Sequence, residues 1–203
     1  DYVYPRTTNK ILNYFLKSKG VAKKDIMETY TPFGHSDYQT IVADIKKFAA
    51  GTPTAVVSTI NGDSNVPFYK ELGNQGLKAE DIPVVAFSVG EEELRGIDAK
   101  PLVGHLAAWN YFMSQDTPEN KAFIKKWNAY VKKHKLPDGS KRVTNDPMEA
   151  TYIGIKMWAQ AAEQAGTTNV DAVRQAVGGQ TVQSPSGYKI TMDAANHHLH
   201  KPV

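Results

Sequence analysis

Blocks of apolar residues alternate along the first half of the chain between a helical and a continuous spacing. Apolar residues three and four positions apart predict helices, and they occur over residues 6–20, 35–51, 61–76 and, as a short helix, 90–96. The apolar runs 54–59 and 83–88 predict buried strands, and further strands are expected over residues 26–31 and 102–109. Strands and helices alternate with short connections, which predicts an α/β fold with a parallel sheet wrapped by helices.

The pattern changes after residue 115, where helical spacing dominates. Thr117 followed by Pro118 is a helix start, because threonine caps the free N–H groups and proline fits the first turn. Further helices are expected over 145–166 and 169–177, after a polar loop at 135–142. The segment TVQSPSGYKITM predicts a hairpin closed by a four-residue turn.

Three local features make these expectations more specific. Ser36 and Gln39 have the spacing of a capping box at the start of the second helix. The run 54–59 has no polar alternation, which predicts a strand covered on both faces. The helix at 145–166 is apolar all round, so we expect it to be buried on more than one side.

Composition describes an ordinary soluble globular protein. The chain has 203 residues, of which 41% are hydrophobic and 22% charged, with a net charge of +3. This length predicts one large domain or two small ones, and the charge is too mild to indicate a nucleic-acid partner. The absence of cysteine excludes disulfides and thiolate metal sites. No apolar run approaches the ~20 residues of a membrane span, and no signal-peptide pattern is present.

Polar side chains directly follow the buried runs. In open α/β sheets, ligands bind beyond the carboxyl ends of the strands, which is the position of these side chains. Asn61 follows one predicted strand, Ser88 and Glu91 follow the next, and Tyr2 and Tyr4 precede the first helix. Helix starts after glycine add free backbone N–H donors. The candidate ligand-binding residues are therefore Tyr2, Tyr4, Asn61, Gly62, Ser88 and Glu91.

Each candidate also has a structural interpretation, and both stay open. The sequence NGDS at 61–64 is a turn and cap signal. Glutamates at a helix start stabilise the helix dipole without any other role. Tyr2 and Tyr4 can be packing residues beside Pro5.

Other chemistries are less well supported. The sequence HHLH at 197–200 has no spaced carboxylate or cysteine to complete a metal site, so we expect no metal and no other cofactor. A hydrolase could use Glu91 to Glu93 with Asp63, but neighbouring glutamates on a helix point in different directions. The basic segment 125–135 fits a solvated helix face, so nucleic acid is not an expected partner. No phosphate-binding loop or nucleophile elbow follows a strand.

Longer stretches of the sequence carry a resemblance that covers nearly the whole chain. They are DYVYPRTTN, TPFGHSDYQTIVADIKKF, STINGDSNVPFYKEL, IPVVAFSVGEEEL, GHLAAWNYF, DTPENKAF, VTNDPMEA and NHHLHKPV. Together they resemble the urea and short-chain-amide branch of the type I periplasmic binding proteins, and in particular the substrate-binding proteins of bacterial urea ABC transporters. A less similar relative, the amide-sensing regulator of an amidase operon, shares the YxYPR pattern of residues 2–6.

The resemblance implies a Rossmann-like fold of two α/β lobes with the ligand between them. This chain would hold the second lobe without its first strand (1–104), a crossing strand with first-lobe helices (105–178), and a return hairpin to the second lobe (179–203). The N-terminal half of the family's pattern is missing, and the absent strand would lie in the middle of the second-lobe sheet. We therefore expect a fragment of a longer protein that binds urea weakly by itself.

The resemblance also implies a function, which is capture of urea or a short amide and delivery to an ABC permease outside the cytoplasm of a bacterium. Urea is a planar molecule with four N–H donors, and a dry pocket must supply acceptors for them. Glu91, Asn61 and Ser88 are the expected acceptors, with Tyr2 or Tyr4 against the flat face or donating to the carbonyl. The alternatives are a cytoplasmic amide-sensing regulator and, more remotely, a carboxylate hydrolase. The partners are the small ligand, the permease and the missing half of the protein.

Overall fold

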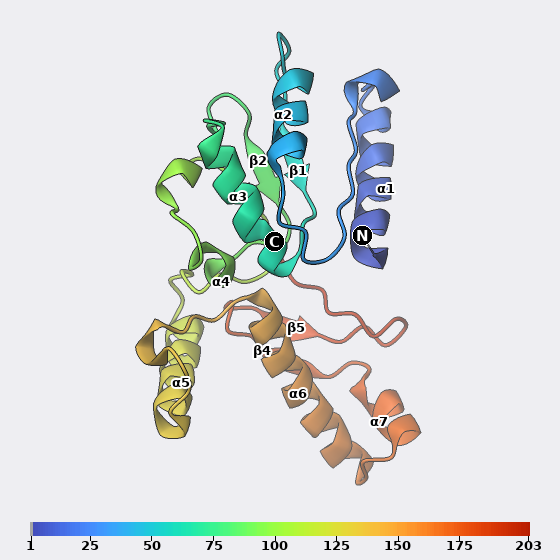
Figure 1. Cartoon of the computed structure of the whole chain (residues 1–203). Coiled ribbons are helices and arrows are strands. Elements are labelled where there is room, and N and C mark those ends of the chain that lie inside the picture. Colours follow the sequence, from blue (N-terminus) through green and yellow to red (C-terminus); the bar gives the residue numbers. More distant parts are fainter. Residues whose placement is uncertain (1) are drawn as a thin grey trace. The chain divides into compact units, whose positions relative to one another are not determined.

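The computed structural model describes residues 2–203, which form two compact units with the division between Ala108 and Trp109. Both units are shown in Figure 1. The assignment of 1–104, 105–178 and 179–203 to the lobes of a longer protein stays a prediction. None of the helices formed by residues 2–203 has the length and apolar character needed to span a bilayer.

The first unit contains the predicted parallel sheet. Its strands are β1 (Val56–Ser58), β2 (Val84–Ala86) and β3 (Leu106–Ala107), in the order β1-β2-β3. Both pairings are parallel, with Val56 opposite Val84 and Val85 opposite Leu106. The α/β fold class with a parallel sheet is confirmed.

Four helices accompany the sheet: α1 (Val3–Ser18), α2 (Gln39–Phe48), α3 (Asn65–Asn74) and α4 (Glu91–Leu94). Short 3-10 turns lie at Lys23–Asp25, Gly62–Ser64 and Lys100–Leu102. The core lies where α2 and α3 pack on the sheet, with Val42, Leu72 and Val84 fully buried. Burial of these apolar side chains is the main stabilising term of the unit.

Several expectations for this unit are wrong. Residues 26–31 form no strand, although the backbone there is not helical, and the strand expected over 102–109 shrinks to two residues. The prediction that β1 is covered on both faces is also wrong, because Val57 is 43% exposed. Consecutive apolar residues predict a strand but cannot supply the neighbouring strand or helix that covers it.

The helix starts differ by a few residues. Helix α1 begins at Val3 rather than after Pro5, and α2 begins at Gln39 with Tyr38 as its N-cap. The expected capping box of Ser36 is wrong, because Ser36 lies two residues before the cap. The Asp37 carboxylate instead accepts a hydrogen bond of 3.2 Å from the backbone N–H of Gln39.

The second unit is helical with one hairpin. Its elements are α5 (Pro118–His134), a 3-10 turn at Gly139–Lys141, α6 (Asp146–Ala165), α7 (Val170–Val177), β4 (Thr181–Gln183) and β5 (Lys189–Thr191). The Thr117 cap is confirmed, since its hydroxyl accepts from the Asn120 N–H at 3.1 Å. The hairpin is also confirmed, with β4 and β5 antiparallel.

The core of this unit joins α6 to the hairpin through Ile153, Met157, Val182 and Ile190. The other side of α6 is exposed in this chain, with Trp158 half exposed. The expectation that α6 is buried on more than one side is therefore wrong, because a helix that is apolar all round still needs a partner for each face.

A buried ion pair fixes the end of the chain in this unit. The Lys201 ammonium contacts the carboxylate of Glu149, which is fully buried, and lies 3.9 Å from Asp146. Ser186 donates to the same Glu149 carboxylate at 3.3 Å. Burial raises the pKa of Glu149 and of Asp146, and the Lys201 charge opposes that rise in both.

Candidate ligand-binding site

Two loops follow the carboxyl ends of β1 and β2, and the Asn65 side chain ties them together. Its amide nitrogen lies 3.2 Å from the Ile60 carbonyl, 3.1 Å from the Gly62 carbonyl and 3.2 Å from the Ser88 carbonyl. Asn65 is fully buried at the start of α3. The rim of the sheet is thus linked by one side chain, whose two N–H groups are shared among three backbone acceptors.

The N-terminal tyrosines contact these two loops in two pairs. The Asn61 amide donates to the Tyr2 hydroxyl, and the Ser88 hydroxyl donates to the Tyr4 hydroxyl at 3.1 Å. The rings of Tyr2 and Tyr4 have centroids 6.1 Å apart. Four of the six predicted residues therefore meet at the carboxyl end of the sheet, where the sequence placed them.

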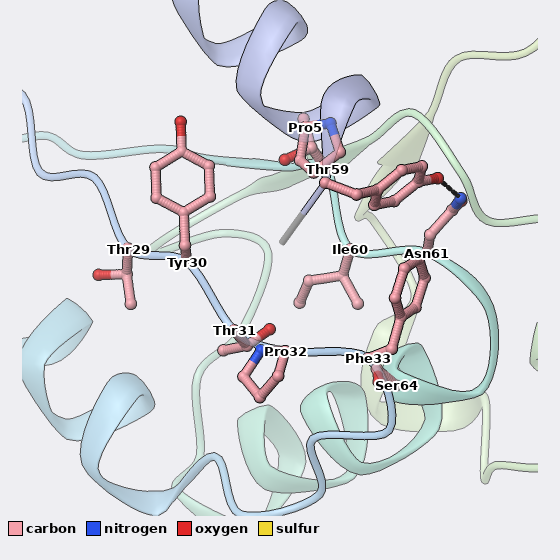
Figure 2. Close-up of a pocket in the computed structure, with 11 residues that line it drawn as sticks. Pro5, Thr29, Tyr30, Thr31, Pro32, Phe33, Thr59, Ile60, Asn61 and Ser64 are labelled. Atoms are coloured by element: carbon pink, nitrogen blue, oxygen red, sulfur yellow. Dashed lines mark hydrogen bonds between the residues drawn. The ribbon is translucent and has the colours of Figure 1, made fainter.

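A cavity of about 50 Å³ lies beside the first pair, and Figure 2 shows its lining. A water needs roughly 10–15 Å³ on this measure, so the cavity has room for a very small solute. Segment 29–33 forms one side and segment 59–61 the other, with Tyr2, Pro5 and Ser64 between them. Phe33 packs on the Tyr2 ring at 4.7 Å and is 67% exposed, so it stands at the open side.

The described lining of this cavity mixes polar and apolar residues and carries no charged side chain. It consists of hydroxyl, amide, aromatic and aliphatic residues: Tyr2, Pro5, Thr29, Tyr30, Thr31, Pro32, Phe33, Thr59, Ile60, Asn61 and Ser64. The nearby Arg6 guanidinium lies over the Tyr30 ring at 3.8 Å and is not part of the lining. Burial and the hydrogen bond to Glu28 raise the pKa of Tyr30, so its phenol stays neutral.

The three glutamates at the start of α4 have different partners. Glu93 accepts a hydrogen bond of 2.9 Å from the Gly90 N–H and thus caps the helix, and Glu92 forms an ion pair of 2.9 Å with Arg95. These two fit the structural interpretation. Glu91 is the first residue of α4, half-buried and three residues after Ser88. It does not line the 50 Å³ cavity.

Gly62 and Tyr4 also lie outside the cavity lining. Gly62 has φ of +63°, a conformation that glycine adopts without strain, and its carbonyl is one of the Asn65 acceptors. Tyr4 reaches the β2 loop, with its hydroxyl 3.5 Å from the Phe87 carbonyl in addition to its bond with Ser88. Both residues shape the rim around the cavity.

Sequence reasoning missed the segment 29–33, which supplies five lining residues. The strand expected over 26–31 covers more than half of that segment. The signal that could have identified it is the string TYTPFG, because proline followed by glycine indicates a loop and exposed aromatics in loops often contact ligands.

The C-terminal histidines lie in the second unit. His200 contacts the Asp193 carboxylate at 3.2 Å. Within residues 2–203, no three metal-ligating side chains come together in a group that could hold an ion.

The geometry shows a small cavity at the carboxyl end of a parallel α/β sheet. Over residues 1–203 the sequence matches the family described as the periplasmic binding protein domain. The chain belongs to that family, and its fold is that of the type I branch.

Solved structures with the same fold are ABC-transporter binding proteins. One is a solute-binding protein from Rhodopseudomonas palustris HaA2 in complex with p-hydroxybenzoic acid, with a TM-score of 0.80 and 23% identity. Another is an amino acid transporter substrate-binding protein from Pseudomonas fluorescens Pf-5, with a TM-score of 0.76 and 21% identity. The likeness covers 99% of this chain in both cases, and 52% and 50% of theirs. This chain thus spans about half the length of the structures it matches.

One curated relative has a different description. A protein named limonene hydroxylase from Geobacillus stearothermophilus is 33% identical over 105 residues, which is 52% of this chain and 18% of that protein. The match is too short to transfer an activity.

Proposed function

We propose that this chain is part of the solute-binding component of an ABC transporter, and that its solute is urea or a short-chain amide. The observation that carries the proposal is that the described lining of the cavity at the carboxyl end of β1 contains hydroxyl and amide groups but no charged side chain. A carboxylate ligand would be buried there without a cation, which is costly. A small neutral solute meets hydroxyl and amide partners together with aromatic and aliphatic surface.

The cellular location and the membrane partner in this proposal are inferred from the family. A binding protein of this kind works outside the cytoplasm and passes its solute to membrane permease subunits, and it needs no catalytic group. We therefore expect no ammonia release when urea or acetamide is incubated with the chain. Ammonia formation above the buffer rate would instead support the hydrolase alternative.

Binding by this chain alone should be weak. The most favourable small ligands gain about 1.5 kcal/mol per heavy atom, so urea can reach roughly 6 kcal/mol when it is fully enclosed. The cavity is open beside Phe33, so the first unit alone does not enclose a ligand. Binding of urea to this 203-residue chain as tight as that ceiling would contradict the need for a second lobe.

The direct test is a titration of this chain followed by backbone NMR. Urea and acetamide should shift the amide signals of Thr59, Asn61 and Phe33, and Asn61→Leu should reduce those shifts because the polar wall is lost. Asn74→Leu, at the exposed end of α3, is the matched control. Shifts spread over the whole chain, or equal effects of the two variants, would remove the cavity from the proposal.

The role of Glu91 is tested by a substitution that removes its charge and keeps its size. Glu91→Gln in a longer protein that encloses the ligand should weaken urea binding by at least ~1 kcal/mol, because a carboxylate accepts the stronger hydrogen bond. Glu92→Gln is the control, since Glu92 is paired with Arg95. Calorimetry that shows equal affinities for both variants would exclude Glu91 from the site.

One observation favours a second candidate, a small aromatic acid. The Tyr2 and Phe33 rings lie 4.7 Å apart, and a flat ring could pack beside them. Two structures with the same fold contain hydroxybenzoates. The same titration with 4-hydroxybenzoate separates the candidates, and we expect it to leave Thr59 and Asn61 unshifted.

A further inference from the structure

Helix α5 of the second unit, drawn in yellow in Figure 1, carries a concentrated positive charge. Its 17 residues include five lysines and one glutamate, so the net charge of this one helix exceeds the +3 of the whole chain. A mild total charge can thus conceal a strong local field, which attracts partners of the opposite sign. All five lysines are exposed: Lys121, Lys125, Lys126, Lys132 and Lys133.

The five lysines lie together on the side of α5 that faces water. At 3.6 residues per turn, they fall within less than half of the helix circumference. Asn120 and Val131, the buried residues of the helix, lie on the opposite side. The other exposed residues between the lysines are uncharged, and they are Ala122, Asn128 and Ala129. These three residues and the five lysines are the basic face of α5.

Most charges of the basic face have no counter-charge in the chain. Lys121 forms an ion pair of 2.6 Å with Asp116. Among the residues that the structure describes, no carboxylate pairs with the other four lysines. Lys132 and Lys133 lie in the last turn, where a cation also stabilises the helix dipole. Lys125 and Lys126 lie in the middle of the helix, so the dipole does not account for them.

The side chains of the basic face indicate the kind of anionic partner. Protein–protein interfaces are enriched in tyrosine, tryptophan and arginine anchors and depleted in lysine. The basic face has lysine, alanine and asparagine, with no arginine and no aromatic residue. A lysine ammonium is a point charge that lacks the planar fork with which arginine recognises a defined carboxylate or phosphate. Such a face fits many mobile anionic groups, as in a layer of lipid headgroups, better than one shaped acidic protein.

Two stacked aromatic rings lie at the margin of the basic face. Tyr130 is half exposed, and its ring centroid is 6.2 Å from that of Trp127 and 4.3 Å from that of His134. Tyrosine and tryptophan are enriched at the headgroup level of membranes. The face itself has no bulky apolar side chain to insert between lipid tails, so the contact expected of it is peripheral and electrostatic.

We propose that the basic face of α5 binds an anionic lipid surface. The helix lies along the surface, its lysine ammonium groups contact the anionic headgroups, and Tyr130 rests at the same level. The binding is reversible, because it comes from charge attraction without an inserted anchor. The proposal depends on the charge of α5 and is independent of the solute that the first unit binds.

The test is sedimentation of this chain with lipid vesicles. Vesicles of phosphatidylcholine and phosphatidylglycerol in equal parts should carry the chain into the pellet at low salt. Vesicles of phosphatidylcholine alone should leave it in solution. Salt should release the bound chain, because the screening length shortens from about 30 Å at 0.01 M to about 3 Å at 1 M ionic strength.

Matched double variants locate the binding. Lys125→Gln combined with Lys126→Gln should weaken binding to the anionic vesicles roughly 25-fold, since each lysine near such a surface contributes about fivefold. Lys156→Gln combined with Lys189→Gln is the control and should weaken it far less. It removes the same charge from exposed lysines of α6 and β5 in the same unit. Circular dichroism confirms that both variants are folded.

Three results would overturn the proposal. One is equal sedimentation with the neutral and the anionic vesicles, which would assign the binding to apolar surface. Another is an equal loss of binding in the two double variants, which would make it a property of total charge. The third is binding of a polyglutamate peptide that depends on Lys125 and Lys126 while the anionic vesicles do not bind, which would make an acidic protein the partner instead.

Discussion

Helices α3 and α1 lie in the same unit and have the same kind of amphipathic sequence, but they are buried to different extents. Helix α3 has ten residues and buries Asn65, Phe68, Tyr69 and Leu72. Helix α1 has sixteen residues and buries Pro5 alone. Both have apolar residues at helical spacing, so local sequence does not explain the difference.

The strands beside each helix explain it. Helix α3 packs where β1 and β2 are paired, and the core there includes Val84 and Ala86, so this is the packed side of the unit. Helix α1 borders a groove of about 230 Å³ beside β1, which α1, α2 and the segments 25–29 and 54–60 line, and its Leu12 and Leu16 face that groove, so this is the groove side. An amphipathic helix gains stability only from the surface that it covers.

The largest expected difference between the two sides comes from removing a leucine. Leu72→Ala on the packed side should cost about 2–5 kcal/mol of unfolding free energy, because Leu72 is fully buried and its loss leaves a cavity. Leu16→Ala on the groove side should cost less than about 1 kcal/mol, since less of that side chain leaves water.

The measurement must report on the unfolding of the first unit, which contains both leucines. All three tryptophans lie in 109–158, so their fluorescence reports the second unit. Exchange of the Val84 and Ala86 amides in increasing denaturant reports the sheet directly. Equal costs for the two leucine variants would mean that α1 is as firmly packed in solution as α3, and the comparison would fail.

The sequence predicts the packed side well because the signals there are local. The runs 54–59 and 83–88 contain β1 and β2, and the helical spacing after NGDS gives α3 within two residues of its ends. The hairpin and the Thr117 cap follow from turn and cap chemistry in the same way. Each of these signals involves residues close together in the chain.

The groove side is predicted less well because it depends on partners that no local pattern specifies. Residues 26–31 have the composition of a strand, but a strand needs a neighbour to form a ladder. The same limit applies to the buried ion pair of Glu149 and Lys201, which are 52 residues apart in sequence. Nothing local to the C-terminal tail indicates that its lysine is buried against α6.

The candidate site is predicted in part for the same reason. Tyr2, Tyr4, Asn61 and Ser88 meet because the carboxyl ends of parallel strands share one edge, which is a property of the fold class. Asn65 escapes prediction, although it holds the rim together, because an asparagine at a helix start has an ordinary capping interpretation. Its three backbone contacts become visible only once the two loops are placed.

An intermediate effect is expected at the rim, on the packed side. Asn65→Ala removes the two N–H groups that three carbonyls share and should cost about 1–3 kcal/mol. It should also weaken any solute binding at the cavity, because the Asn61 loop loses its link to the Ser88 loop. Asn74→Ala is the control, since the Asn74 amide contacts the exposed Glu71 carboxylate, and it should change stability by less than about 0.5 kcal/mol.

Denaturation monitored by sheet exchange gives the stability of both asparagine variants. A cost for Asn65→Ala as small as that for Asn74→Ala would show that the rim is held by the strands alone.

The smallest expected effect is a loss of stability at acidic pH, which should arise on the packed side. The His105 Nδ1 accepts a hydrogen bond of 3.0 Å from the Val84 N–H, and burial lowers the pKa of His105 below its ordinary value of 6.5. The folded chain therefore binds fewer protons than the unfolded chain once the pH falls below about 6.5, so stability should decrease there. Tyr69, whose ring lies 6.4 Å from His105, does not contribute because burial raises the pKa of Tyr69 to about 12.

This effect should be confined to the packed side. As the pH falls from 7 to 5, the Val84 amide should lose protection after correction for intrinsic exchange, because a protonated Nδ1 can no longer accept its hydrogen bond. The Val57 amide points away from β2 and should show no such change. His105→Gln removes the titrating group, so its stability should lose less on the same acidification. If the wild-type chain and His105→Gln lose the same stability between pH 7 and 5, His105 is not the group that couples the packed side to pH, and carboxylates elsewhere account for the change.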